Sequence, residues 1–303
     1  MTATYLERLG ARSRAAGTVL CLGLDPDPAT IPDRFAKGVA GLERFAELVL
    51  EAALPFAAAV KPNLAFFEAF GSAGIAALER LRATIPADIP VIADAKRGDI
   101  GSTAARQAVA LFDVLGADAV TVSPYLGQEA IRPLLEREDR FAYVLCRTSN
   151  PGAGEVQDLR VLTGASGAGD AAAGDASEPL HERVARLATR WGPGGTVGLV
   201  VGATAPEELA TIRRVAPGLP FLVPGVGAQG GAIEPVLDHG PANTPPGWGH
   251  PGGGLLVNVS RGIAGAITDD PDRDPGEAVA RAAADWARRL PVLPLPPPMN
   301  RGI

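Results

Sequence analysis

Eight short apolar runs, each of a length typical of a β-strand, recur along the chain with room for a helix between them. They are Thr18–Leu24, Phe56–Lys61, Pro90–Ala95, Ala117–Val122, Phe141–Arg147, Thr196–Val201, Leu219–Val223 and Leu255–Ser260. The segments between them show helical periodicity, as in Leu42–Ala53, Thr103–Leu115, Pro179–Trp191 and Pro206–Val215. Strands that alternate strictly with helices pair in parallel, so the pattern predicts an α/β fold, and eight repeats favour a closed (β/α)8 TIM barrel. A doubly wound open sheet is the structural alternative.

The length of 303 residues suits one such unit, so we expect residues 1–303 to form a single barrel domain with Gly/Pro-rich loop insertions. Two stretches, 160–178 and 240–254, interrupt the alternation and contain little apolar surface. They cannot offset the entropy of ordering them, which predicts flexible, solvated loops. The proline-rich tail, 290–303, is compatible with an extended strap or a frayed end, and we assign it no function.

Charge and composition exclude several classes of protein. The net charge of −6 argues against a nucleic-acid binder, which needs a basic field. No run approaches the roughly 18 apolar residues of a membrane span, and the first 17 residues read as an amphipathic helix rather than a secretory signal. Cys21 and Cys146 both lie in apolar runs, which indicates buried free thiols, and we expect a cytoplasmic protein.

The densest polar cluster lies where the third strand ends and the next helix begins. Asp94 and Lys96 are two apart in a strand, so both should point into the barrel mouth. Asp99 and Thr103 are four apart and should share one face of the following helix. Lys61, at the end of the second strand, brings another ammonium to the same rim. Because active sites of such barrels lie at the carboxyl ends of the strands, the cluster is a candidate catalytic site.

A purely structural interpretation competes with this one. Asp99 could cap a helix, and Asp94 with Lys61 could form a structural ion pair. For any single residue the two interpretations are about equally good, since structural pairs also perturb pKa values. Ionised groups placed together at strand ends are costly to desolvate unless paired, so the set as a whole favours function.

A glycine-rich segment, Pro224-Gly-Val-Gly-Ala-Gln229-Gly230, follows the seventh strand, and Arg261 follows the eighth. Glycines allow backbone N–H groups to approach an anion, a helix expected to start near Gly230 would point its positive end there, and Arg261 adds a fork of donors. Barrels often bind phosphate with these two loops, so we predict a phosphate site. The segment also fits G-x-G-x-x-G, but it lacks the dinucleotide context. A glycine-rich turn without ligand is the alternative.

Two further polar residues fall on the same rim. Asp25 ends the first strand and Ser149 follows the fifth, and either could be only a turn residue. The three histidines, His181, His239 and His250, form no ligand pattern, so no metal site is expected.

These motifs resemble the orotidine 5′-phosphate decarboxylase family, and especially its longer bacterial branch, type 2. The family signature D-x-K-x-x-D-I-x-x-T is matched by Asp94, Lys96, Asp99, Ile100 and Thr103, and the family's preceding lysine by Lys61. The likeness extends from Asp25 to Arg261. The two insertions and the loop Ser123-Pro124-Tyr125 after the fourth strand depart from the family pattern.

The resemblance implies a carboxy-lyase that converts orotidine 5′-phosphate to UMP in de novo pyrimidine biosynthesis, without metal or organic cofactor. Lys96 would protonate C6 of the pyrimidine as CO2 leaves, with Asp94 against the departing carboxylate. Lys61, Asp94, Lys96 and Asp99 would form the charged network. Asp99 and Thr103 would reach into the neighbouring subunit's site of a homodimer.

The same resemblance assigns the remaining contacts of a small-molecule substrate. Asp25 and Lys61 would hold the ribose hydroxyls, Ser149 the pyrimidine edge, and Gln229 and Arg261 the phosphate. Residue chemistry agrees with the catalytic role, because loss of CO2 from an sp2 carbon leaves a carbanion with no electron acceptor. A fixed ammonium can stabilise and then protonate such a carbanion.

Two other functions remain open at this point. One is a sister barrel that shares D-x-K-x-x-D and handles sugar phosphates with Mg2+, as a decarboxylase or an aldolase. The continuation into Ile100 and Thr103 favours the nucleotide enzyme. The other is a non-catalytic nucleotide-sensing barrel, which would not need Lys96 between two aspartates.

Overall fold

The computed structural model describes residues 3–162, 177–269 and 273–294. Its main sheet has eight parallel strands: β1 (Leu20–Leu24), β2 (Ala59–Pro62), β3 (Ile92–Arg97), β4 (Ala119–Val122), β5 (Phe141–Arg147), β8 (Val197–Val201), β9 (Phe221–Val223) and β10 (Leu256–Val259). Their order is β2-β1-β10-β9-β8-β5-β4-β3. The two end strands meet through parallel bridges from Val60 to Val91 and from Asn63 to Asp94, which bring the sheet round on itself. The predicted (β/α)8 barrel is confirmed, and the doubly wound sheet is excluded.

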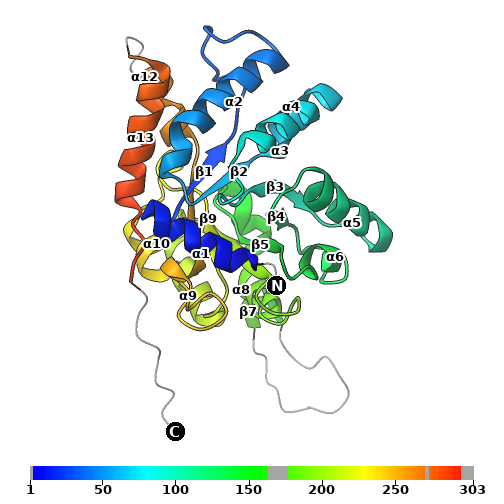
Figure 1. Cartoon of the computed structure of the whole chain (residues 1–303). Coiled ribbons are helices and arrows are strands. Elements are labelled where there is room, and N and C mark those ends of the chain that lie inside the picture. Colours follow the sequence, from blue (N-terminus) through cyan, green and yellow to red (C-terminus); the bar gives the residue numbers. More distant parts are fainter. Residues whose placement is uncertain (1–2, 163–176, 270–272, 295–303) are drawn as a thin grey trace, which may run out of the picture.

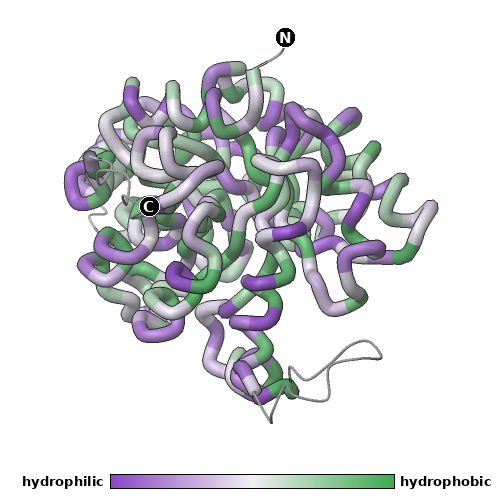
Figure 2. The backbone as a smooth tube through the Cα atoms, turned by 90° about the horizontal axis from the view of Figure 1, so that it is seen from below, coloured by the Kyte–Doolittle hydropathy of each residue, from purple (hydrophilic) through white to green (hydrophobic). Residues whose placement is uncertain are grey.

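Helices surround the strands (Figure 1). They are α1 (Tyr5–Ala16), α2 (Val39–Ala53), α3 (Leu64–Glu68), α4 (Gly71–Thr84), α5 (Gly101–Ala108), α6 (Arg132–Leu135), α7 (Gly154–Gln157), α8 (Leu180–Ala188), α9 (Pro206–Val215), α10 (Glu234–His239), α11 (Arg261–Ala264), α12 (Ala266–Asp269) and α13 (Pro275–Arg289). The predicted helix Pro206–Val215 has the observed bounds, whereas Thr103–Leu115 is α5 followed by a π-helical turn, Val109–Val114. No described helix is both long and apolar enough to cross a bilayer. Apolar segments run mainly through the middle of the molecule (Figure 2).

Helix α1 closes the amino end of the barrel, where it crosses in front of the strands in Figure 1. Tyr5, Leu6 and Leu9 are buried among the inward-facing residues of the strands. The Tyr5 ring stacks on Phe141 with a centroid separation of 4.7 Å, and its hydroxyl lies 3.2 Å from that of Tyr143. Because α1 fills this end, the barrel is open at the opposite end, where the strands finish.

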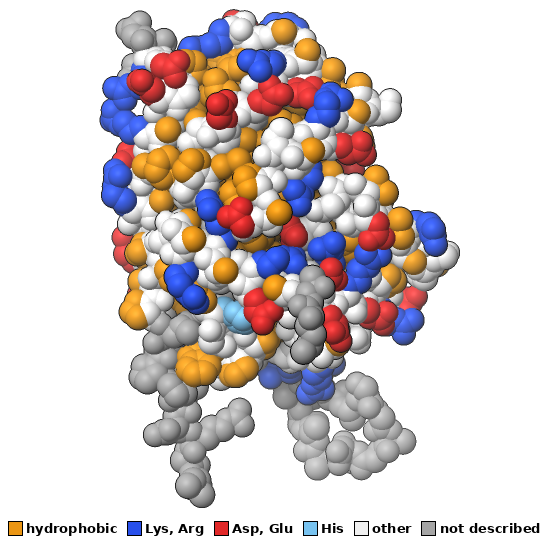
Figure 3. Space-filling view, viewed as in Figure 1, with side chains coloured by type: hydrophobic (Ala, Val, Ile, Leu, Met, Phe, Trp, Pro, Cys, Tyr) orange, Lys and Arg blue, Asp and Glu red, His pale blue; other side chains and the backbone are white. Residues whose placement is uncertain are grey.

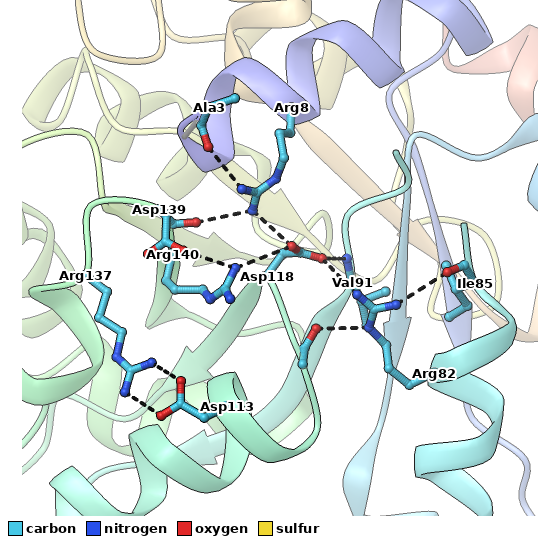
Figure 4. Close-up of polar contacts among 11 residues, drawn as sticks. Ala3, Arg8, Arg82, Ile85, Val91, Asp113, Asp118, Arg137, Asp139 and Arg140 are labelled. Atoms are coloured by element: carbon cyan, nitrogen blue, oxygen red, sulfur yellow. Dashed lines mark hydrogen bonds and ion pairs between the residues drawn. The ribbon is translucent and has the colours of Figure 1, made fainter. Parts of the chain in front are cut away.

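An arginine cluster, formed by Arg8, Arg82 and Arg140 around Asp118, holds α1 against the barrel (Figure 4). Asp118, just before β4, accepts a hydrogen bond of 2.9 Å from Arg8 of α1 and another of 2.9 Å from the backbone N–H of Val91. Arg82 and Arg140 each lie 3.8 Å from the same carboxylate. Acidic and basic side chains are interspersed over this face of the molecule (Figure 3). Asp118 therefore ties together the helix and three strand beginnings.

The segment 240–254 does not match the prediction of a flexible, solvated loop. Ala242 and Gly252 are buried, and the Ala242 N–H donates to the carbonyl of Gly253. Arg213 reaches the segment from α9 and donates to the Gly240 carbonyl. Burial lowers the pKa of Arg213 to about 9. The prediction failed because backbone hydrogen bonds and close glycine packing order the segment. The prediction considered only apolar side chains, and neither of these interactions requires them.

The other two irregular segments are only partly described. Residues Arg160–Leu162 and Ser177–Pro179 pair as an antiparallel two-stranded ribbon, β6 and β7, which the sequence analysis did not predict. The expectation for residues 163–176 lies outside the described residues. In the tail, Leu290 is buried and its carbonyl accepts hydrogen bonds from Val19 N–H and the Thr18 hydroxyl. Residues 295–303 also lie outside the described part.

Candidate active site

Two lysines form ion pairs with one aspartate at the carboxyl ends of β2 and β3. Lys61 Nζ lies 2.6 Å from Asp94 Oδ2, and Lys96 Nζ lies 2.6 Å from Asp94 Oδ1. The side chains of Lys61 and Asp94 are 6% and 11% exposed, whereas that of Lys96 is 50% exposed. The predicted convergence of these three residues is confirmed. All three residues line one cavity, and Lys96 is the most exposed of them.

Opposite charges hold Asp94 and Lys61 in their ionised forms at neutral pH. Burial by itself raises the pKa of Asp94, but the Lys61 and Lys96 ammonium groups outweigh it and hold that pKa well below its usual range. Burial likewise lowers the pKa of Lys61, yet the carboxylates of Asp94 and Asp25 raise it above its ordinary value. The site therefore presents fixed charges of both signs.

The strand that carries Asp94 and Lys96 is irregular. Lys96 has a φ of 48°, and among the described residues it is the one non-glycine in the left-handed region. Residue pairing with β4 shifts between Ala93 and Arg97, so the alternation assumed from sequence does not hold through this stretch. Strain of this kind persists only where surrounding contacts maintain it, and it is common at functional sites.

The charged network opens into a cavity of about 360 Å³. Its lining comprises Lys61, Asp94, Lys96, Thr121, Leu145, Thr148, Ser149, Asn150, Gln157, Val200, Leu222 and Pro224. Apolar side chains from neighbouring strands thus form one wall and polar side chains from the loop after β5 form another. An apolar cavity with a few convergent polar groups is typical of a small-molecule site. Ser149 lies where the sequence analysis placed it, on the rim.

The glycine-rich segment forms a tight turn after β9. The N–H of Gly231 donates to the carbonyl of Gly225, and Gly225, Gly227 and Gly230 all have positive φ. A methyl group on Gly225 would lie 2.9 Å from Ser149 Cβ and 3.0 Å from Gln229 Oε1, so this glycine lets the two side chains approach. The predicted helix start near Gly230 is wrong, because α10 begins at Glu234 after the turn closes on itself.

Asp25 and Arg261 lie on the same end of the barrel, at the ends of β1 and β10. Asp25 Oδ1 is buried and has no hydrogen-bond partner among the described residues. A buried carboxylate oxygen without a donor is unfavourable, so this atom is suited to accept a hydrogen bond from a bound molecule. Arg261 is exposed, and its guanidinium is available to an anion.

Asp99 and Thr103 do not join the network. Asp99 precedes α5 and its carboxylate accepts a hydrogen bond from Ile100 N–H, so the prediction that it shares a helix face with Thr103 is wrong. Thr103 faces a separate groove between α4 and α5. Neither residue lines the cavity that contains Lys96.

Sequence reasoning missed several polar residues of the cavity. Thr121 lies in a strand that otherwise reads as apolar, and its hydroxyl bonds to Asp94 at 2.9 Å. Gln157 accepts a hydrogen bond from Thr148 N–H and holds the loop after β5. The rarity of lysine in the sequence could also have pointed to the two lysines of the network, because the chain has only three, Lys37, Lys61 and Lys96. The described residues contain no cluster of His, Cys, Asp and Glu suited to a metal ion.

Comparison with known proteins identifies the family. Residues 18–279 match the model of the family described as "Orotidine 5'-phosphate decarboxylase / HUMPS family". The chain belongs to this family. An orotidine 5′-phosphate decarboxylase of Roseiflexus castenholzii is 46% identical over 287 residues, covering 94% of this chain and 95% of the relative. One from Herpetosiphon aurantiacus is 43% identical over 279 residues, covering 92% of this chain and 96% of the relative.

Solved structures agree with the fold. The OMP decarboxylase of Leishmania donovani superposes with a TM-score of 0.75 at 39% identity, covering 94% of this chain and 98% of that one. The UMP synthase of the same organism gives a TM-score of 0.78 at 40% identity, covering 95% of this chain but 56% of that longer one. The membership that the motif around Asp94 and Lys96 suggested is confirmed.

Proposed function

We propose that this chain decarboxylates orotidine 5′-phosphate to UMP in pyrimidine biosynthesis, with Lys96 as the proton donor. The supporting observation is the Lys61–Asp94–Lys96 network, which lines the cavity with Lys96 as its most exposed member, in a chain of this family. We also place the enzyme in the cytoplasm, since its two cysteines, Cys21 and Cys146, are buried free thiols.

Lys96 would act at the carbon that loses CO2. As the C–C bond breaks, its electron pair stays on C6 in an orbital that the ring does not delocalise. The ammonium, held beside Asp94, stabilises that pair and then donates a proton to C6, while CO2 departs. Asp94, whose lowered pKa keeps it ionised, would face the substrate carboxylate and raise the energy of the bound substrate relative to the transition state, in which that carboxylate is leaving as neutral CO2.

The rest of the rim would hold the nucleotide. Asp25 and Lys61 would bind the ribose hydroxyls, and the unpartnered Asp25 oxygen supports this role because a hydroxyl supplies the missing donor. Ser149 would contact the pyrimidine edge, and Gln229 with Arg261 the phosphate. A phosphate remote from the reacting carbon provides binding energy that can orient the ring against Lys96.

We further propose a homodimer in which Asp99 and Thr103 complete the partner's site. Their absence from the cavity of their own subunit supports this arrangement. Mixing Asp99→Ala subunits with Lys96→Ala subunits would then give mixed dimers with one intact site, and about a quarter of wild-type activity after random exchange. No recovery after verified exchange would contradict the shared site.

The direct test is an ultraviolet assay of orotidine 5′-phosphate loss by the purified protein, with and without a chelator. We expect turnover that the chelator does not change. Loss of activity with chelator, or turnover of sugar phosphates alone, would favour the Mg2+-dependent sister activity. Binding of UMP without turnover of orotidine 5′-phosphate would favour a non-catalytic sensor.

A further inference from the structure

We propose that Thr121 of β4 is a positioning residue that holds Lys96 and Asp94 in their reactive arrangement. This inference rests on the proposed function of the same site. Thr121 is 2% exposed and lies under the charged network, at the edge of the cavity.

The hydroxyl of Thr121 makes three hydrogen bonds, all to the segment that carries the network. It donates to Asp94 Oδ1 at 2.9 Å. It accepts from the backbone N–H of Ala95 at 3.1 Å and from that of Lys96 at 3.0 Å. A hydroxyl has one donor and two acceptor positions, so these bonds use its full capacity.

These bonds replace strand pairing where β3 bulges away from β4. Ala93 pairs with Val120 and Arg97 with Val122, which leaves residues 94–96 opposite Thr121 alone. Two N–H groups of the bulge therefore bond to a side chain in place of a neighbouring strand. Without that oxygen these partly buried N–H groups would lack these partners, which is unfavourable.

The bulge is also where the backbone is strained. Lys96 has its φ of 48° beside the two amides that Thr121 binds. The Thr121 hydroxyl oxygen that binds this backbone also bonds to the Asp94 carboxylate. Thr121 therefore positions both residues of the 2.6 Å contact between Asp94 and Lys96. We infer that Thr121 acts through Lys96 and Asp94 on the chemical step, with little effect on nucleotide binding.

The test compares Thr121→Val with Thr121→Ser. Valine has nearly the same shape but makes none of the three bonds, whereas serine can make all of them. For Thr121→Val we expect kcat to fall about 10- to 100-fold, because small misplacements of reacting groups have effects of this size, with KM within about threefold. For Thr121→Ser we expect kcat within about fivefold of wild type.

Thr196→Val is a matched control. Thr196 is also 2% exposed, lies at the amino end of β8, and donates one hydrogen bond of 2.7 Å to the Leu135 carbonyl. This substitution should lower the free energy of unfolding without changing kcat. If Thr121→Val loses stability like the control but retains kcat, or if Thr121→Ser loses as much kcat as Thr121→Val, the proposal is wrong. Should Thr121→Val not fold, Thr121→Ala replaces it in the same comparison.

A crystal structure of Thr121→Val separates this proposal from the proposed function. We expect Lys96 to leave the positive-φ region and its ammonium to move away from Asp94. An unchanged backbone at residues 94–96 would overturn the inference whatever the activity. A wild-type protein that fails to turn over orotidine 5′-phosphate would overturn the proposed function, and the geometry in the variant would still decide the role of Thr121.

Discussion

The two ends of the barrel each place one aspartate among cations, but the surroundings differ. At the amino end, Asp118 is bound by Arg8 and by the backbone of Val91, under the cover of α1 (Figure 4). At the carboxyl end, Asp94 is held by Lys61 and Lys96 beside a cavity of about 360 Å³. The first cluster is enclosed by protein, whereas the second leaves an ammonium half exposed.

The choice of cation separates the two clusters further. The chain has 28 lysines and arginines, and only three of them, Lys37, Lys61 and Lys96, are lysines. Guanidinium groups suit fixed, forked contacts and keep their protons, whereas an ammonium is a compact charge that can give up a proton. A sequence that otherwise uses arginine nearly throughout has lysine at both cationic positions of the network. The amino-end cluster therefore holds the fold, whereas lysine at the carboxyl end is consistent with the chemical role that we propose for it.

Replacing Lys96 tests this contrast most strongly. We expect Lys96→Ala, which removes both the charge and the proton donor, and Lys96→Arg, which keeps a charge but does not give up its proton, each to lower kcat by about 10⁴-fold or more. The free energy of unfolding should change by no more than about 1 kcal/mol, since the side chain is half exposed. Steady-state assays and urea titrations measure the two effects. Lys37→Arg is the matched control, because Lys37 lies in an exposed ion pair, and it should behave as wild type. Substantial turnover by Lys96→Arg would refute the role of the ammonium.

Asp118→Asn should lower stability and leave kcat nearly unchanged, which is the opposite of the result expected for Lys96→Ala. It leaves Arg8, Arg82 and Arg140 without their shared counter-charge, and breaking a buried ion pair typically costs about 3 kcal/mol or more. Because the site lies at the other end of the barrel, kcat should stay within about threefold of wild type in the folded protein. Denaturant unfolding and the decarboxylation assay are run on the same sample. A large fall in kcat with unchanged stability would mean that the two ends are coupled.

The acid dependence of stability should depend on Asp94. Its pKa is lower in the folded than in the unfolded chain, so its contribution is complete above the unfolded pKa of about 3.9 and is lost as the pH falls below it. As the pH falls from about 4 towards about 2, wild type should lose up to about 1.4 kcal/mol per pH unit more than Asp94→Asn. Urea unfolding at several pH values gives both slopes. Identical slopes would show that Asp94 is not selectively stabilised as a carboxylate.

The smallest effect is expected at the start of α1. Thr4 and Glu7 form a reciprocal capping box, with Thr4 N–H donating to the Glu7 carboxylate at 2.7 Å. Thr4→Ala should lower the free energy of unfolding by about 1 kcal/mol and leave kcat unchanged. Thermal and urea unfolding measure the loss, and Thr4→Ser, which preserves the cap, is the control. If the free energy of unfolding fell as much as in Asp118→Asn, the cap and not the arginine cluster around Asp118 would be what holds α1 in place.

Much of the fold and part of the site were predictable because they depend on local pattern. The eight parallel strands match the eight apolar runs, and the positions of Lys61, Asp94 and Lys96 at strand ends correctly predicted one network. The segment 240–254 was mispredicted because its order comes from a hydrogen bond that the Arg213 side chain of α9 donates to its backbone and from glycine packing. The place of Asp99 before α5 was mispredicted because the helix begins two residues later than the spacing suggested.

The sequence by itself determined the barrel and the identity of the charged groups, since strand and helix periodicity and residue chemistry are written along the chain. Only the tertiary structure decided how those groups are held. The bulge at Lys96, the support from Thr121 and the closure of the amino end by α1 join residues far apart in sequence. Hydrogen bonds between distant strands depend on where the folded backbone places each atom, and no local pattern contains that information.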